Sequence, residues 1–201
     1  MKRGVYISLI CMLFLLPDTS SGEAPHQIGG FALGRQMTEF ADRLKMDTLL
    51  PLRHSKFIQE IETSELAGFK YGLIWVGSCA EPGRIVRIRL KYADPSKNFY
   101  KQLLKHYKKR FGDPSEWKGD PFHIVIAWKW SSVDKDNNRI SLMLQHNTRD
   151  EDESIGNSVK LTMWNLIEDE RECFEKKTAA ETKKTKRKKP PQPDWEVLIP
   201  H

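Results

Sequence analysis

The side chains that most often carry acid–base or metal chemistry are scattered along this chain. Its histidines form no HExxH pair, and the sequence holds neither a GxSxG nucleophile elbow nor a phosphate-binding P-loop. A catalytic set can also be assembled from distant residues, so a secreted hydrolase whose pocket gathers His123 or His146 with carboxylates is the alternative to a non-enzymatic binding protein. The sequence favours the binding protein and predicts no cofactor. The histidines are His26, His54, His106, His123, His146 and His201.

One acidic segment has the opening spacing of a calcium loop. Asp134, Asp136 and Asn138 occupy positions 1, 3 and 5 of such a loop. Arg139 stands where the loop needs glycine, and Gln145 stands where it needs a bidentate glutamate. The residues are also those that favour turns, so the segment is predicted to be a hairpin turn without a metal.

Cations in strand-like segments are the better candidates for binding. In RIVRIRLKY, Arg87, Arg89 and Lys91 alternate with apolar residues and are predicted to point away from the core. Lys70, Lys129 and Lys160, in other alternating segments, are predicted to point outward as well, and Lys129 joins the three residues of this strand as a candidate ligand-binding residue. Clustered Arg and Lys can bind phosphate, sulfate or carboxylate groups. Solvated strands also carry such residues for solubility and to discourage edge pairing, so anion binding by these four residues is a hypothesis.

The N-terminus has the pattern of a secretory signal peptide. A basic start is followed by an apolar run at 4–16 and then by small residues, with cleavage expected after Gly22 or Ala24. The run is shorter than the roughly 20 residues that span a membrane. We therefore expect residues 1–22 to be a signal peptide and the mature chain to be periplasmic or secreted, with no transmembrane segment.

Export would remove Cys11 and leave one pair of cysteines. In an oxidising compartment Cys79 and Cys173 are predicted to form a disulfide. The alternative is two separate buried thiols. Neither cysteine has a Cys or His at the spacing of a metal site.

Much of the net charge of +6 lies in the C-terminal segment 178–201. Its composition of lysines and prolines predicts a disordered tail. The tail could make an electrostatic contact with anionic lipid, a cell-wall polymer or an envelope protein. Nucleic acid is not expected as a partner, because export contradicts a nuclear or nucleic-acid address. The candidate contact residues are Lys183, Lys184, Lys186, Arg187, Lys188 and Lys189.

The remaining residues, 23–177, are predicted to form a single domain. Alternation predicts strands at 69–77, 84–92, 122–130, 139–146 and 158–164. Phe69, Tyr71, Leu73 and Trp75 are expected to share one face, as are Phe122, Ile124, Ile126, Trp128 and Trp130. Helices are expected at 37–44, at 97–111 after the N-cap Ser96, and close to Cys173.

The order of these elements predicts an α+β fold. Helices would cover one face of an antiparallel sheet, and the order also admits two halves, each a helix followed by strands. The connector FGDPSEWKGDPF between the second helix and the next strand is predicted to be a corner, with Trp117 as its one candidate functional residue.

Three stretches resemble those of an exported protein family. IGGFALG, LKYADPSKNFYKQLLKHYKKRFGDPSEWKGDPF and IAWKWS are similar to uncharacterised exported proteins of Gram-negative bacteria, notably sulfate reducers, over residues 28–175. The resemblance implies a periplasmic setting and a single domain, and it brings no functional residues. The order of helices and strands also resembles small envelope modules of the β-lactamase-inhibitor-protein type, in architecture alone. A structural envelope component is therefore a further alternative to a binding protein.

Overall fold

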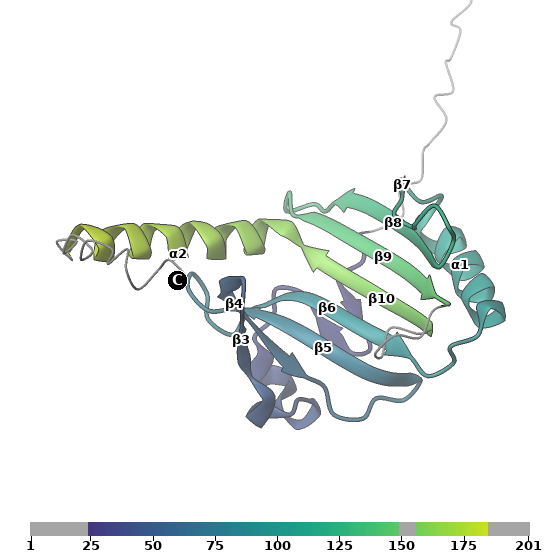
Figure 1. Ribbon diagram of the computed structural model, residues 1–201, viewed down its shortest axis with the longest axis horizontal. Coiled ribbons are helices and arrows are strands. Elements are labelled where there is room, and N and C mark those ends of the chain that lie inside the picture. Colours follow the sequence, from purple (N-terminus) through teal and green to yellow (C-terminus); the bar gives the residue numbers. More distant parts are fainter. Residues whose placement is uncertain (1–23, 149–155, 185–201) are drawn as a thin grey trace, which may run out of the picture.

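The computed structural model describes residues 24–148 and 156–184 (Figure 1). The elements in chain order are β1 (Gln27–Ile28), β2 (Phe31–Ala32), the 3₁₀ helices η1 (Met37–Arg43) and η2 (Met46–Thr48), β3 (Leu50–Leu52), β4 (Ser55–Glu62), β5 (Phe69–Gly77), β6 (Ile85–Tyr92), α1 (Lys97–Phe111), β7 (Glu116–Trp117), β8 (Val125–Val133), β9 (Arg139–Asn147), β10 (Gly156–Met163) and α2 (Trp164–Lys184). The fold class is α+β, as predicted.

Eight of the described strands form one antiparallel sheet in the order β3-β4-β5-β6-β10-β9-β8-β7. Two runs of consecutively paired strands, β3 to β6 and β7 to β10, meet where β6 pairs with β10. The helix η1 precedes the first run and α1 precedes the second. This order of elements matches the expected two halves of a helix followed by strands.

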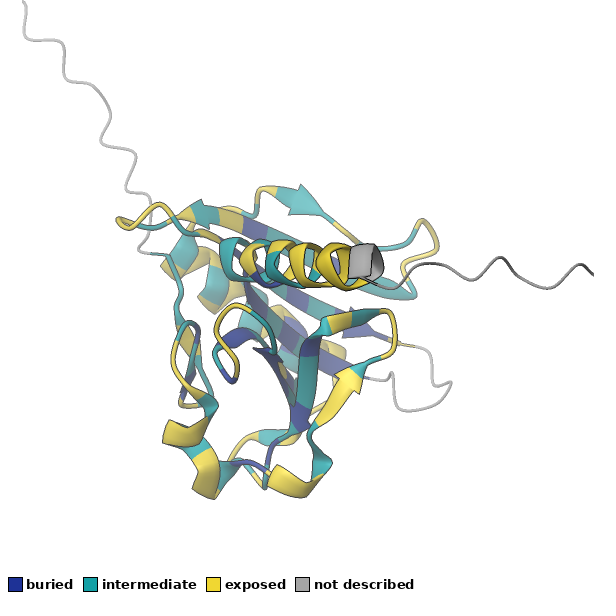
Figure 2. Cartoon of the chain, turned by 90° about the vertical axis from the view of Figure 1, so that its left-hand side faces the viewer, coloured by how far each residue is buried: buried dark blue, intermediate teal, exposed yellow. Residues whose placement is uncertain are grey.

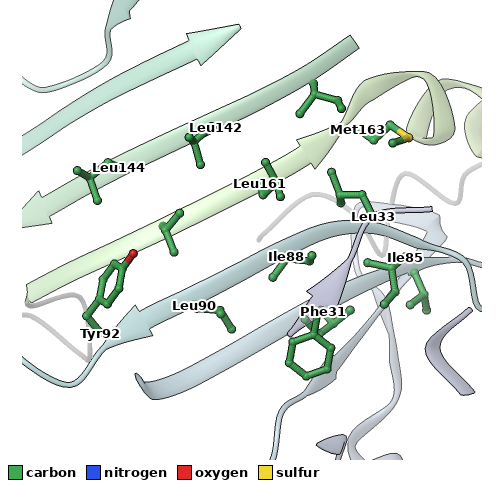
Figure 3. Close-up of a cluster of buried hydrophobic side chains, with 14 of the residues drawn as sticks. Phe31, Leu33, Ile85, Ile88, Leu90, Tyr92, Leu142, Leu144, Leu161 and Met163 are labelled. Atoms are coloured by element: carbon green, nitrogen blue, oxygen red, sulfur yellow. The ribbon is translucent and has the colours of Figure 1, made fainter. Parts of the chain in front are cut away.

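One face of the sheet carries the main hydrophobic core. Ile88, Leu161 and Leu142 lie opposite one another on β6, β10 and β9, and all three are buried (Figure 3). Phe31 and Leu33, from the N-terminal segment, also belong to this cluster. Alternation along the central strands places every second side chain here, so the strands that the sequence predicts also define the core.

Helix α1 covers this core face. Its apolar stripe packs against the cluster through Phe99, Leu103 and Tyr107, while Tyr100 is buried. The Ser96 hydroxyl accepts a hydrogen bond from the Phe99 backbone N–H at 3.2 Å, which caps the first turn. The predicted helix and its N-cap are confirmed.

The predicted face of β5 holds for Tyr71, Leu73 and Trp75, which share the face opposite the main core, but not for Phe69. Ile74 and Val76 are fully buried in the main core, whereas Tyr71 is exposed on the opposite face. Phe69 does pack against the main core, but a register shift lies between Phe69 and Tyr71. Because such an irregularity changes which face the following residues occupy, an alternation counted from Phe69 fails beyond it.

The start of β8 also differs from the prediction. The strand begins at Val125, and Phe122 lies before it with 83% of its surface exposed. Ile126 and Trp128 pack against the main core and Trp130 is buried in it, as expected. The Asp120 side chain accepts the backbone N–H of Phe122 at 2.8 Å and also that of Val125. This turn carries the chain into the strand later than the hydrophobic pattern indicates.

Helix α2 begins beside the opposite face of the sheet. Leu166 and Ile167 pack on a second cluster formed by Ile58, Trp75 and Val86. The helix then extends away from the sheet (Figure 1), and Figure 2 shows exposed residues over much of its surface. It ends at Lys184, so the predicted domain boundary at residue 177 falls inside a helix. Among the described helices, none combines the length and the apolar character required to cross a bilayer.

Candidate anion-binding face

Five cations lie on the sheet face opposite the main core, and we call this set the basic face. Lys160 lies opposite Arg89 across the β6–β10 pair and opposite Met143 across the β9–β10 pair. Met143 in turn lies opposite Lys129 of β8. One row of side chains therefore crosses four strands. The members of the basic face are Arg87, Arg89 and Lys91 of β6, Lys129 of β8 and Lys160 of β10.

Two of the cations at the centre of the basic face are partly removed from water, whereas Arg89 is exposed. Lys160 and Arg87 are half-buried on the two central strands. Burial lowers the pKa of the Lys160 ammonium below its ordinary value, and the positive charges of Arg87, Arg89 and Lys129 lower it further. Burial alone lowers the pKa of the Arg87 guanidinium. Both shifts mean that these groups carry their charges at a free-energy cost in the folded protein.

Aromatic rings hold Arg87 in place. Its guanidinium carbon lies 5.6 Å from the ring centroid of Trp75 and 5.7 Å from that of Trp164, within the range of cation–π attraction. Its Nε donates a hydrogen bond to the Thr162 hydroxyl at 3.1 Å. A guanidinium carries five N–H donors in a planar fork, so the terminal nitrogens remain able to bind a ligand.

The central cations are not neutralised within the described residues. In the ranges 24–148 and 156–181, no carboxylate lies at ion-pair distance from Arg87, Arg89 or Lys160. Lys129 differs, because its Nζ lies 3.3 Å from a Glu116 oxygen. The centre of the face is thus a concentration of positive charge without a partner in this part of the chain.

A hollow of about 330 Å³ adjoins the basic face, and we call it the Trp164 hollow. Trp164, the first residue of α2, is 39% exposed, and its indole Nε1 donates a hydrogen bond to the Ser141 hydroxyl at 3.0 Å. The lining residues are Lys129, Ser131, Ser132, Val133, Arg139, Ile140, Ser141 and Trp164. Of these, the sequence had singled out Lys129 for binding. The serines gave no motif, and Trp164 reaches the site only because α2 starts beside the basic face.

Two contacts join the first half of α2 to the β5–β6 loop. The Sγ atoms of Cys79 and Cys173 lie 2.15 Å apart, at disulfide distance, as predicted. The buried Glu170 carboxylate accepts the backbone N–H groups of residues 78–81 at 2.6–3.0 Å. A Cβ at Gly77 would lie 2.2 Å from Glu170 Oε1, so this approach requires glycine. Sequence reasoning missed Glu170, whose partners are about ninety residues away in the chain.

Among the described residues, neither of the two histidines considered for a hydrolase forms an ion pair with a carboxylate. His146 is buried, and its Nδ1 lies 2.8 Å from the Asn157 side-chain oxygen. Asn157 donates to the carbonyls of Asp94 and Ser96, so its oxygen is the acceptor and His146 Nδ1 carries the proton. His123 lies in the turn before β8 with φ 56°. His146 and Asn157 together thus link β9 and β10 to the start of α1.

The predicted hairpin turn is confirmed. The Asp134 carboxylate accepts hydrogen bonds from the backbone N–H of Asp136 and from both the backbone and side chain of Asn138. The Asp134 carboxylate therefore stabilises the turn in which it lies. Across the described residues, no three or more His, Cys, Asp or Glu side chains gather where they could hold a metal ion.

The structure also places Trp117 and two of the candidate tail cations. Trp117 lies in the edge strand β7, with its ring centroid 4.8 Å from that of Trp128, so the connector contains a short strand as well as a corner. Of the tail cations, Lys183 and Lys184 belong to α2, whereas Lys186 to Lys189 lie outside the described residues, as does the proposed signal peptide.

Comparisons with known proteins identified no relative of this chain. No protein-family model matches the chain, and searches of curated proteins and of solved structures found no significant match.

Proposed function

We propose that this protein is a non-enzymatic, exported binding protein of the cell envelope that holds an anionic ligand on its basic face. One observation carries the proposal. Arg87, Arg89 and Lys160 lie together at the centre of the sheet, without a carboxylate partner in the described part of the chain.

The physical basis is desolvation. A half-buried cation has lost hydration, and a bound phosphate, sulfate or carboxylate would replace the lost water with charge-assisted hydrogen bonds. The repulsion among neighbouring cations would fall at the same time. Cations present only for solubility need neither burial nor mutual contact. The lysines of α1, such as Lys101 and Lys105, are of that kind, because they are exposed.

An exported location rests on two features of the chain. The first is the signal-like pattern of residues 1–22. The second is the Cys79–Cys173 pair at disulfide distance, since disulfides persist mainly in oxidising compartments. The ligand is therefore expected among the anionic components of the envelope, either lipids or cell-wall polymers.

The test compares two variants of equal charge. In R89Q/K160Q two cations of the basic face are neutralised, and in K101Q/K105Q two exposed cations of α1 are neutralised. Titration calorimetry with dextran sulfate and with sodium polyphosphate at low salt should show at least about tenfold weaker binding for R89Q/K160Q, because each lost charge-assisted hydrogen bond is worth about 1.5–3 kcal/mol. The control should stay within about twofold of the parent protein. Equal losses in both variants would mean that only net charge matters, and the proposal would then fail.

A further inference from the structure

We propose that the ligand of the basic face is an acidic polysaccharide, with one sugar ring seated in the Trp164 hollow and its acidic groups on Arg87, Arg89 and Lys160. This inference rests on the proposed function and adds the chemical class of the ligand.

The Trp164 hollow has the chemistry of a sugar subsite. Its volume of about 330 Å³ is at the lower end of the range for small-molecule sites. The partly exposed Trp164 ring offers an apolar surface on which the C–H face of a sugar can stack. Ser131, Ser132 and Ser141 line the same space with hydroxyl groups, which both donate and accept hydrogen bonds.

Ser141 has a proton free for a ligand. Its oxygen accepts the Trp164 indole N–H at 3.0 Å. No hydrogen bond donated by the Ser141 hydroxyl is found among the described residues. A hydroxyl that has accepted one bond still has its own donor, and Ser141 is 7% exposed beside the hollow. A sugar oxygen would satisfy it.

The charges divide into two zones. Lys129 lies beside Glu116, which also pairs with Lys118, and Arg139 is paired with Glu168, so each cation that lines the hollow has a carboxylate at ion-pair distance. The uncompensated cations lie beside it in the same cross-strand rows, on β10 and β6. A complementary ligand therefore has a polyhydroxylated, uncharged part joined to negative groups, and an acidic polysaccharide combines the two.

Two other polyanions fit less well. Bilayer phosphates lie in a plane, which exposed lysines can reach more easily than the half-buried Lys160 and Arg87. Polyphosphate has the charge but no ring for Trp164. Strands are about 4.8 Å apart, so the step from Lys129 over Met143 to Lys160 is about 10 Å, and a short oligosaccharide can contact both zones.

The experiment separates the hollow from the charges. The probes are a purified oligogalacturonate, sodium polyphosphate, an oligothymidylate and phosphatidylglycerol vesicles, each titrated against the full mature chain. W164A should weaken oligogalacturonate binding at least about fivefold, the cost of one lost aromatic stacking contact, and should leave polyphosphate binding within about twofold. S141A should weaken oligogalacturonate binding about threefold with the same polyphosphate control. F122A, which removes an exposed aromatic ring that lies before β8 and does not line the hollow, is the control and should bind all probes like the parent.

Each outcome decides between the two proposals. Retained polyphosphate binding by W164A also shows that the variant is folded, and S141A repeats the test with a smaller change. If polyphosphate binds through Arg89 and Lys160 while oligogalacturonate does not depend on Trp164 or Ser141, the sugar inference is wrong and the proposed function stands. A Trp164-dependent preference for oligothymidylate, or binding to vesicles alone, would also overturn the inference. If no probe depends on Arg89 and Lys160, both proposals fail.

Discussion

At the residue scale, the Lys160 ammonium lowers the stability of the fold and has a proposed role in binding an anion. It lies on a central strand next to Arg89, and its pKa is lowered chiefly by burial. Residues selected only for stability do not usually place an ammonium group among other cations. The stability of the protein should therefore improve when this charge is removed, while binding suffers.

We expect K160M to raise the free energy of unfolding at pH 7 by about 0.5–1 kcal/mol, the scale of a partly exposed charge interaction. Because the folded-state pKa is below the unfolded one, the parent protein carries the cost at neutral pH. As pH rises through the folded pKa towards about 10.4, the ammonium deprotonates in the folded state and the cost disappears. The difference between variant and parent should therefore shrink towards alkaline pH.

Urea unfolding at a series of pH values checks this expectation. The exposed lysine variant K101M is the control, and its stability difference should not change with pH over that window. A K160M protein less stable than the parent at pH 7 would show that the ammonium is stabilised in the fold, which would contradict both the pKa direction and the argument from desolvation.

At the scale of elements, the position of α2 decides whether the Trp164 hollow exists. Trp164 is the first residue of the helix, and the same first turn packs on the second cluster through Leu166 and Ile167. Glu170 and the Cys79–Cys173 pair then join the helix to the β5–β6 loop. The hollow thus depends on contacts made further along the same helix.

We expect C79A/C173A to lower the free energy of unfolding by about 2–5 kcal/mol. The two cysteines are 94 residues apart, and a crosslink that closes so long a loop restricts the unfolded chain strongly. The Glu170 contacts should keep α2 docked, so polyphosphate binding is expected to persist at temperatures well below the unfolding transition.

Guanidinium unfolding of the parent, with and without a reductant, provides the comparison. The reduced parent should unfold at nearly the same denaturant concentration as C79A/C173A. A parent protein unaffected by reductant, with two free thiols by mass spectrometry, would show that the cysteines are not bonded in solution.

At the scale of the whole molecule, the two candidate binding regions carry their positive charge in separate places. The basic face lies on the sheet, and the cations of the C-terminal segment lie beyond it along the sequence. The two can act on different partners, because a ligand that fits the sheet need not contact the tail. Since α2 continues to Lys184, a deletion should begin after that residue and leave the helix complete.

Deletion of residues 185–201 is expected to weaken binding to phosphatidylglycerol vesicles by about tenfold or more at low salt, with little effect at high salt, where exposed charges are screened. Vesicle sedimentation measures the change, and oligogalacturonate binding on the sheet should remain within about twofold. An unchanged vesicle partition at low salt would refute the proposed contact of the tail.

Much of this molecule follows from local sequence pattern. Helix α1 and its Ser96 cap, the hairpin at Asp134 and the inward residues of β9 all depend on spacing within a few residues, and each is found where it was expected. The parity of the cysteines that would remain after export was enough to predict the pairing of Cys79 with Cys173. The errors in β5 and at the start of β8 come from a register shift and a turn, which interrupt alternation without changing composition.

Only the tertiary structure decided which distant residues become neighbours. The sequence placed Arg87, Arg89, Lys129 and Lys160 on outward positions, but only the pairing of β6 with β10 brought Lys160 against Arg89. Trp164 faces Arg87 because β10 leads directly into α2, and Glu170 reaches a loop far away in sequence. Local patterns reflect interactions between near neighbours, whereas strand order and helix docking depend on long-range contacts whose energies are shared over the whole core. The residues of the candidate site could therefore be named in part from the sequence, and the site itself could not.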